Sequence, residues 1–326
     1  MVFLLAASSS SAQDIHWSQF NDNPIFQNPG NAGHFKGDVR FVGNYRDQWR
    51  SVTVPYSTFS ISADANLYRH KNLGYGILFF HDVVGDGQFR TIEVQANVSY
   101  LIKLTKDSTH SVRPGINIGL NHRQLNYDQL YFDSQYDGIA YNPALATNES
   151  FQTDRKSNLS IGVGGIYQYY NNDRFNFTIG LGAFNLNRPN QGFFTTVIER
   201  DIRTNLFGKG IYKLNYDWDL VPGFNLSIQG KYREFNIGSS VKYTLLNRLG
   251  QYRALYAGLW YRNRDAASIS VGMDYQSWFV GVSYDINFSK LVPASRARGG
   301  IEVAVRYILH RFKPKKIVHR ICPDYI

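Results

Sequence analysis

The stretch Thr58–Leu67, with the sequence TFSISADANL, decides the fold because polar and apolar residues alternate along it without a break. Its odd-numbered residues are apolar and its even-numbered residues are polar. Successive side chains of a β-strand point to opposite faces, so this stretch predicts a strand with one apolar and one polar face. The same alternation recurs along the chain, at residues 159–167, 175–181, 269–275 and 301–307.

A soluble β-sandwich would give the same alternation, with its apolar faces turned inward. Three features favour a membrane barrel instead. The segments run to about 9–13 residues, which suits a tilted strand that crosses a bilayer, whereas sandwich strands are shorter. Their polar faces are rich in Gly and Ser beside charged residues, as a lumen wall would be. Aromatic residues gather at segment ends, as in the girdles of membrane barrels; examples are Tyr45, Tyr167, Trp260, Trp278 and Phe279.

The predicted fold is therefore all-β, a transmembrane antiparallel up-and-down β-barrel of about 14 strands, an even number as bacterial barrels prefer. We place it at residues 37–310. The interval Gln124–Lys156 is polar and irregular, so we expect a long loop there. The expected strands centre near Val42, Ile61, Ile77, Val94, Ile116, Val163, Ile179, Phe207, Phe224, Ile237, Leu259, Ile269, Val282 and Val303.

Composition excludes several other classes of protein. The 326 residues are 43% hydrophobic with a mean hydropathy of −0.33, and no apolar run approaches the roughly 18 residues of a spanning helix. The net charge of +10 would suit a nucleic-acid-binding protein, but the basic residues are scattered except near the C-terminus, so we expect no nucleic-acid partner. The single cysteine, Cys322, excludes a disulfide within the chain and a zinc site of several cysteines.

Three segments lie outside the expected barrel. Residues 1–12 are apolar and then small, as in a signal peptide with a cut at Ala12–Gln13, although the stretch is short and has no basic start. Residues 13–36 are rich in turn-forming residues. Residues 311–326 form a basic tail that Pro314 and Pro323 prevent from extending the last strand.

Six short motifs, in order along the chain, resemble those of the PorP/SprF family. His16–Phe20 and Asn23–Gly33 match its opening, which reads Ser-Gln, Asn-Pro, then Asn-Pro-Ala and Gly; here Gly30 stands in place of the usual Ala. Asn44–Trp49 is similar to its Tyr-Arg-x-Gln-Trp. Asn185–Gln191 is similar to its His-Leu-Asn-x-Pro, with Asn185 where His is commoner. The remaining motifs are Ser283–Ile286, Gly300–Glu302 and Ile321–Pro323.

The resemblance implies an outer-membrane protein of the Bacteroidetes that serves type IX secretion or gliding motility. It implies as partners a secreted surface protein, often an adhesin, and outer-membrane lipid. The alternative that remains is a transport barrel for a small hydrophobic solute. An outer-membrane enzyme is a further class, but neither a Gly-x-Ser-x-Gly elbow nor a metal-binding His spacing occurs in the sequence, and we expect no catalytic residues, cofactor or metal.

Charges on the inward faces predict a lumen network. Glu302 and Arg306 share one face of the last strand, and Asp274 and Asp285 belong to the strands before it. We expect these four side chains to brace or plug the barrel, in preference to lining a conducting path.

With an even number of strands, both termini fall on the periplasmic side. We therefore expect the N-terminal segment and the tail to lie side by side below the barrel, as a platform for a periplasmic ring component or a peptidoglycan-linked lipoprotein. The alternative is that the tail only closes the barrel floor. The candidate docking residues are Asn28, Pro29, Gly33, Lys313, Lys315, Lys316, Arg320, Cys322 and Pro323.

Overall fold

The computed structural model describes residues 14–48, 54–67, 72–85, 87–148, 153–171, 174–193, 197–248, 251–289 and 298–310. Its strands are β1 (Val39–Gln48), β2 (Tyr56–Asn66), β3 (Leu73–Val84), β4 (Phe89–Tyr100), β5 (Ile102–Lys103), β6 (His110–Gln124), β7 (Arg155–Asn171), β8 (Phe175–Phe184), β9 (Arg203–Lys213), β10 (Trp218–Gln229), β11 (Tyr232–Arg248), β12 (Gln251–Arg262), β13 (Ala266–Tyr275), β14 (Trp278–Asn287) and β15 (Arg298–Leu309). The helical elements are η1 (Phe20–Asp22), α1 (Pro24–Gln27), η2 (Pro29–Asn31), η3 (Tyr127–Gln129) and η4 (Asp133–Gln135).

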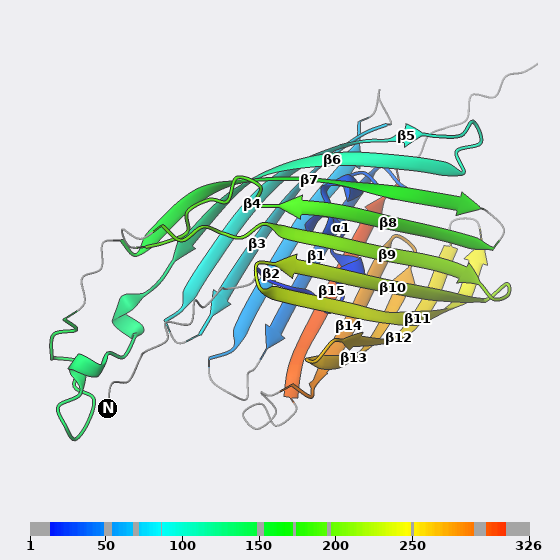
Figure 1. Ribbon diagram of the computed structural model, residues 1–326. Helices are drawn as coiled ribbons and strands as arrows, with labels where there is room; N and C mark the ends of the chain where they lie inside the picture. The colour runs from blue at the N-terminus through cyan, green and yellow to red at the C-terminus, as the bar shows by residue number, and fades with distance from the viewer. Residues whose placement is uncertain are drawn as a thin grey trace, which may run out of the picture.

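The strands form one closed antiparallel sheet (Figure 1). Each long strand pairs with its neighbours in sequence, β4 pairs with β6, and β1 pairs with β15 along its whole length. The short β5 continues β4 and pairs with β6. Within the described residues the ring thus contains fourteen long strands, each at an expected centre, and the predicted barrel is confirmed.

The two faces of the sheet separate by polarity as the alternation predicts. Apolar side chains point outward, where Ile77 is 59% exposed and Leu259 is 69% exposed. Polar side chains point inward, and those of Asn97 and Asn117 are almost fully buried. An apolar outer surface around a polar interior is the arrangement of a barrel in a bilayer.

The two ends of the barrel differ in the connections they carry. Residues 125–154, 185–202 and 288–297 are the three longest intervals between strands, and all three lie at one end, which we call the long-loop end. The opposite end joins strands mostly by short intervals such as 172–174, 249–250 and 276–277, and we call it the short-turn end. None of the helices in the described residues is long and apolar enough to span a bilayer.

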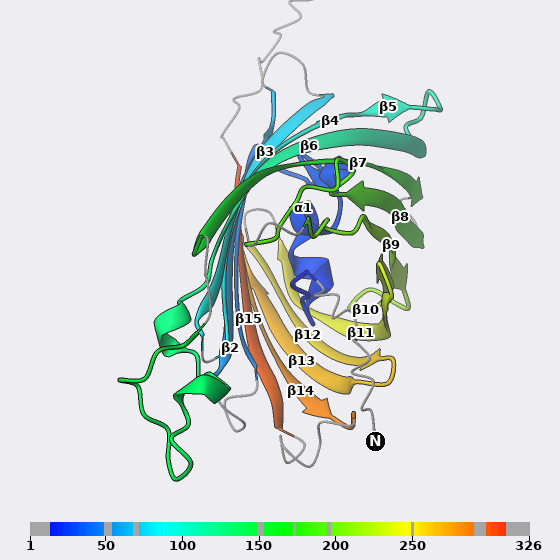
Figure 2. The same cartoon turned by 60° about the vertical axis from the view of Figure 1, so that its left-hand side comes forward.

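The segment before β1 fills the barrel (Figure 2). We call residues 14–36 the plug; it contains η1, α1 and η2, and Ile25 and Asn28 are completely buried. The expectation that this segment lies below the barrel is therefore wrong. Its many turn-forming residues do keep it out of the sheet, but its polar groups find partners on the inner wall, as described below.

Some aromatic residues expected in the girdles also point inward. Trp260 packs edge-on against Phe20 of the plug, with ring centroids 5.2 Å apart, and Phe279 is buried. The aromatic cluster on the outside of the short-turn end consists of other pairs, such as Trp278 with Tyr307 and Trp218 with Tyr243. An aromatic residue near a strand end therefore marks the girdle only when its position in the alternation also points it outward.

Candidate functional site

The plug runs through the barrel from one end to the other. At the long-loop end, the backbone N–H of Asp14 donates to Gln229 Oε1 at 2.7 Å. At the short-turn end, Lys36 Nζ donates to the Tyr170 hydroxyl at 3.0 Å. The plug therefore occupies the lumen along its axis and ends where β1 begins.

The barrel wall supplies hydrogen bonds to the irregular backbone of the plug. The carbonyl oxygen of Ala32 accepts from Ser99 Oγ at 2.6 Å and from Arg113 Nη1 at 2.9 Å. The carbonyl oxygen of Gln27 accepts from Asn205 Nδ2 at 2.9 Å. These bonds replace the ladder that the plug lacks, which is the condition for burying irregular backbone.

Glycines on the inner wall let the plug approach the sheet closely. A Cβ added at Gly164 would lie 2.7 Å from Asn28 Oδ1, and one at Gly115 would lie 2.6 Å from the backbone nitrogen of Gly30. Neither distance is compatible with a real side-chain carbon. The Gly-rich inner faces seen in the sequence therefore serve contact with the plug.

A small apolar core fastens the plug to β3. Trp17, Ile25 and Phe26 of the plug pack against Leu78 and Phe80, and all five side chains are buried. The ring of Phe26 meets that of Phe80 edge-on, with centroids 6.1 Å apart. This core lies inside the barrel and contributes the apolar burial that the polar lumen otherwise lacks.

A first ion group joins β1, β12, β14 and β15 to the plug. Arg46 Nη2 lies 3.0 Å from Asp285 Oδ2, and Arg262 Nη2 lies 2.7 Å from the same oxygen. Ser18 Oγ donates to Asp285 at 2.7 Å, and the backbone N–H groups of Ser18 and Gln19 donate to Glu302. Removing any one charge here would leave a buried partner uncompensated.

A second ion group lies beneath the connection 185–202, at the long-loop end. Arg200 Nη2 contacts Asp14 Oδ1 at 2.8 Å, and Arg200 Nη1 contacts Glu93 Oε2 at 3.2 Å. The guanidinium of Arg203 lies 4.3 Å from the ring centroids of both Phe26 and Phe184.

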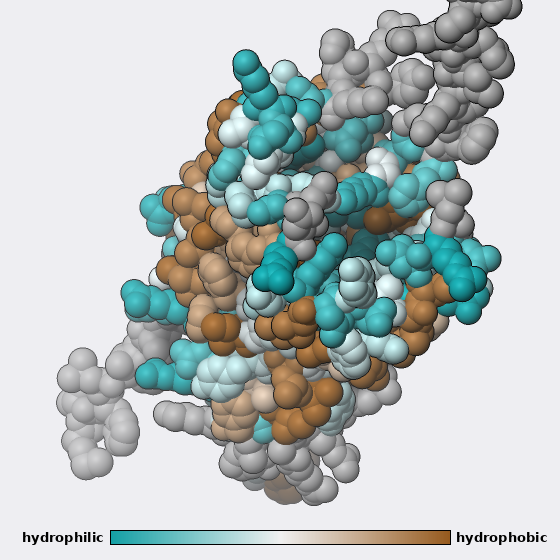
Figure 3. All heavy atoms as spheres, turned by 90° about the vertical axis from the view of Figure 1, so that its right-hand side faces the viewer, coloured by the Kyte–Doolittle hydropathy of each residue, from teal (hydrophilic) through white to brown (hydrophobic). Residues whose placement is uncertain are grey.

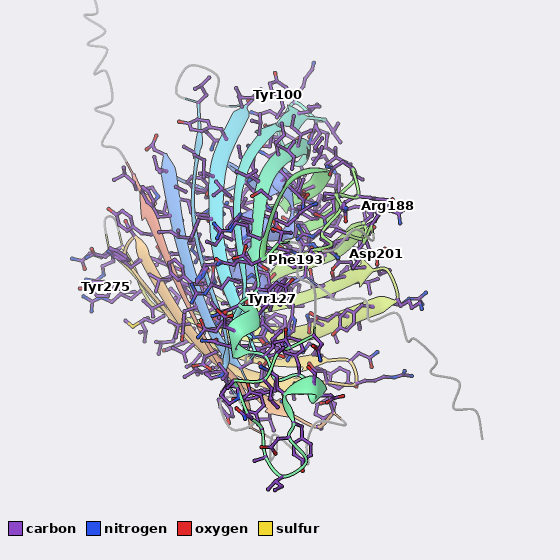
Figure 4. The ribbon with its side chains drawn as sticks, turned by 90° about the vertical axis from the view of Figure 1, so that its left-hand side faces the viewer. Tyr100, Tyr127, Arg188, Phe193, Asp201 and Tyr275 are labelled. Carbon is purple, nitrogen blue, oxygen red and sulfur yellow. The ribbon has the colours of Figure 1, made fainter. Side chains whose placement is uncertain are left out.

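Arg188, Phe193 and Asp201, from the same connection, are seen in Figure 4, which faces this side of the barrel. Phe193 meets Phe89 edge-on, with centroids 6.2 Å apart, and Arg123 donates to Gln191. The connection therefore reaches across to the strands β4 and β6 and covers the start of the plug.

The four expected lumen charges all lie in the interior, but in two separate groups. Asp285 and Glu302 belong to the first ion group. Arg306 contacts Asp274 at 3.5 Å and Asp22 of the plug at 3.3 Å, nearer the short-turn end. The first ion group and the cluster of Arg306, Asp274 and Asp22 both include plug atoms, so the four expected charges hold the plug in place.

The expected docking residues of the N-terminal segment do not face a partner. Asn28, Pro29 and Gly33 are buried against the wall, where the N–H of Gly33 donates to Asp64 Oδ2 at 2.7 Å. Their assignment as docking residues is therefore wrong. The others, Lys313, Lys315, Lys316, Arg320, Cys322 and Pro323, lie outside the described residues.

Two of the cavities beside the plug have volumes above 200 Å³. One, of about 220 Å³, lies between η1 and the inner faces of β12–β14 and is lined in part by Phe20, Trp260 and Phe279. The other, of about 520 Å³, lies toward the short-turn end, between the end of the plug and β7–β9. Figure 3 faces this side of the molecule, and hydrophilic side chains gather over the middle and right of the view. In the described part of the chain, no group of three or more His, Cys, Asp or Glu residues could hold a metal ion.

Sequence reasoning missed several residues of the ion groups, among them Asp14, Arg46, Glu93, Arg200 and Arg262. Arg46 could have been predicted, because it stands between Tyr45 and Asp47 in a family-like motif and its position in the alternation points it inward. Arg200 could not have been predicted, since it belongs to a connection without periodicity.

Comparison with known proteins gives a family match and a set of similar folds. The family model described as "Type IX secretion system membrane protein PorP/SprF" matches residues 9–307. A search of curated proteins finds no match. The toluene transporter TbuX of Ralstonia pickettii is similar in structure, with a TM-score of 0.53, 9% identity, and coverage of 89% of this chain and 94% of that one.

Two further solved structures give the same result. The toluene transporter TodX of Pseudomonas putida has a TM-score of 0.52 at 12% identity and covers 88% of this chain and 93% of its own. A FadL homologue of Pseudomonas aeruginosa has a TM-score of 0.51 at 11% identity, with 89% and 94% covered. At these identities the likeness concerns the fold alone.

Proposed function

The chain belongs to the PorP/SprF family of type IX secretion system membrane proteins, and from this we propose that it is a non-conducting scaffold of that machinery in the outer membrane. In this role it supports the export or surface anchoring of a secreted protein, such as an adhesin, and performs no catalysis. The observation that carries the proposal is the plug: its Asp14 pairs with Arg200 and Arg203 toward the long-loop end, and its Asp22 pairs with Arg306 nearer the short-turn end. A lumen filled in this way favours holding partners over passing solutes.

The two ends suggest how the scaffold is oriented. Long loops of such barrels face outside and short turns face the periplasm. We infer that the long-loop end is extracellular and that β15 ends on the periplasmic side. The secreted partner then meets the connections 125–154 and 185–202, where Ile139 is 91% exposed and Val197 is 65% exposed.

The basic tail, residues 311–326, follows β15 and remains our candidate for docking a periplasmic ring component or a peptidoglycan-linked lipoprotein. Deletion of Lys315–Ile326 tests this role. We expect a normally abundant, correctly inserted barrel that no longer supports export. Export at the normal level would contradict the docking role, and loss of the barrel itself would show that the tail is structural.

A transport barrel for a small hydrophobic solute is the second candidate. Two of the similar structures are toluene transporters, and the 220 Å³ cavity lined by Phe20, Trp260 and Phe279 is the observation that favours it. Transport would require the plug to move, because the plug lies between the two ends of the lumen.

A disulfide between plug and wall separates the two candidates. Asn23 Nδ2 donates to Ser60 Oγ at 2.9 Å, and both residues are buried, so Asn23→Cys with Ser60→Cys is the pair to engineer, and formation of its disulfide is verified first by free-thiol titration after oxidation. The pair is made in a Cys322→Ser background, with each single cysteine variant as the control.

We expect the oxidised pair to support export as well as the single variants do, and to leave toluene uptake into proteoliposomes at background in both redox states. Export that fails on oxidation and returns on reduction would overturn a static scaffold. Uptake that oxidation abolishes would establish the transporter.

A further inference from the structure

The larger cavity is bordered by more positive than negative charge. Of the residues around its 520 Å³, the cationic ones are Lys36, Arg40, Lys209, Lys213, Lys242 and Arg306, and the only acidic one is Asp219. His34 also borders it, but burial of its ring lowers its pKa to about 4, so it is neutral at pH 7. The cavity therefore carries an excess of fixed positive charge inside a barrel lumen.

Three of these cations already have carboxylate partners. Arg40 pairs with Asp64 at 2.8 Å, Lys242 with Asp219 at 2.9 Å, and Arg306 with Asp22 at 3.3 Å. Lys209 and Lys213 have no ion-pair or side-chain hydrogen-bond partner among the described residues. Among the described residues, the hydrogen-bond and cation–π partner of the Lys36 ammonium is Tyr170, through its hydroxyl and its ring. The structural ion pairs thus leave three ammonium groups available.

The two free lysines of β9 lie on its inward face, with Lys209 deeper in the lumen and Lys213 at the rim of the short-turn end. Lys209, Ile211 and Lys213 alternate with outward residues, and all three line the cavity. A strand rises about 3.3 Å per residue, so the two lysines are roughly 13 Å apart along the wall. Side chains that stand perpendicular to the sheet keep about this spacing, which exceeds the width of a single phosphate. The apolar side chains of Phe207 and Ile211 line the same cavity and suit the carbon skeleton of a longer ligand.

We propose that this cavity is a binding site for an extended acidic peptide segment, with carboxylates that contact Lys209 and Lys213. A chain laid along β9 would place side chains of alternate residues on the lysine side, at the spacing of the wall itself. A lipid phosphate fits less well, because lipids surround the outer face of the barrel and the lysines point into the lumen.

The proposal rests on the proposed function only for the identity of the partner. If the short-turn end is periplasmic, the acidic segment belongs to a periplasmic component of the machinery. Binding itself can be measured on the purified full-length barrel in detergent, without any secretion. The probe is a fluorescein-labelled octapeptide of alternating glutamate and serine, followed by fluorescence anisotropy. The control peptide carries glutamine in place of glutamate.

We expect the acidic peptide to bind and the glutamine peptide not to bind. The double variant Lys209→Gln with Lys213→Gln should weaken binding by about tenfold or more, with a smaller dependence on salt, since two ionic contacts are lost. The matched control is Lys103→Gln with Lys106→Gln, which removes the same charge from exposed positions at the same end, outside the cavity, and should bind normally.

If the double variant does not fold, Lys213→Gln alone keeps the test, because this side chain is exposed at the rim; it should weaken binding by roughly threefold. Equal affinity of all variants would overturn the site. Saturable binding of inorganic phosphate, or of phosphatidylglycerol in nanodiscs, that requires the two lysines while peptide binding does not, would overturn the peptide assignment.

Normal peptide binding by a barrel that is dispensable for export would contradict only the scaffold proposal. Absent peptide binding by a barrel that is needed for export would contradict only the site.

Discussion

Arg46 on β1 donates to Asp285 on β14, with Nη2 and Oδ2 3.0 Å apart, across 239 residues of sequence. Both side chains are about 2% exposed, and the same guanidinium donates to the carbonyl oxygen of His16 in the plug. The Arg46 side chain therefore links β1, β14 and the plug.

Replacing Arg46 with glutamine should destabilise the barrel strongly. The change leaves Asp285 and Glu302 with less compensation in a buried setting, at a cost of roughly 3–5 kcal/mol. The matched control is Arg188→Gln, which breaks an exposed pair with Glu199 at 3.0 Å and should cost at most about 1 kcal/mol. The measurement is urea unfolding in liposomes, followed by tryptophan fluorescence. Similar midpoints for the two variants would mean that the Arg46 group is not a structural contact.

Substitution by alanine should lower stability at one of two adjacent glycines and be tolerated at the other. Gly164→Ala puts a Cβ 2.7 Å from Asn28 and 2.9 Å from Pro29, so the plug must shift, at a cost of about 1–3 kcal/mol. At Gly165, on the lipid side, the nearest atom is 3.7 Å away, and alanine should be tolerated. Conductance in planar bilayers reports whether the plug blocks the lumen, and we expect transient openings for Gly164→Ala only. A silent Gly164→Ala with unchanged stability would argue against the close plug contact.

The two faces of β13 should tolerate charge differently. Val271 is 58% exposed on the outer face, so Val271→Arg should cost roughly 2–4 kcal/mol near the bilayer midplane. Ser270 borders the 220 Å³ cavity, where the long side chain of Ser270→Arg finds room, and the polar residues Asn21 and Asp22 of the plug border the same cavity. Heat-dependent gel mobility of membrane fractions gives the amount of folded barrel for each variant. Equal yields would show that the register or the membrane setting is wrong.

Acidification should destabilise the plug through His34. Its folded pKa is lowered to about 4 from 6.5 by burial, with a smaller effect of Arg40 and Arg113 that opposes the contact with Gln168. The unfolded chain therefore binds more protons between these values, so this stability is complete above pH 6.5 and is lost as pH falls toward 4. Melting temperatures from pH 7 to 4 should fall more steeply for the wild type than for His34→Gln. His122→Gln serves as the control for loss of a histidine outside the plug, and a His34→Gln profile as steep as that of the wild type would contradict this role of His34.

The sequence was sufficient for the sheet because alternation is a local signal. The alternation within each segment assigns its polar and apolar faces, as it does for Thr58–Leu67. All fourteen expected strand centres fall within observed strands. It was insufficient for the plug because residues 14–36 have no periodicity. Their partners are single side chains such as Asp64, Ser99 and Asn205, which are far away in sequence and chemically ordinary.

The same reason explains the split of the expected lumen charges. Alternation assigns Asp274, Asp285, Glu302 and Arg306 to the interior, but it gives no depth along the barrel axis. Depth follows from strand register, and register places Asp285 nearest the long-loop end and Arg306 toward the other. The inward aromatics Trp260 and Phe279 could have been found by counting alternate positions instead of proximity to strand ends.

The pairing of β1 with β15 also sets an order of assembly. The seam joins the first strand to the last, so it cannot form until the final strand has been delivered to the membrane. The plug is held by side chains from strands all around the ring, and a closed seam leaves no lateral way for it to enter. The β1–β15 pairing therefore favours an order of assembly in which the wall closes around an N-terminal segment that is already in position, and sealing the seam is the step that confines the plug.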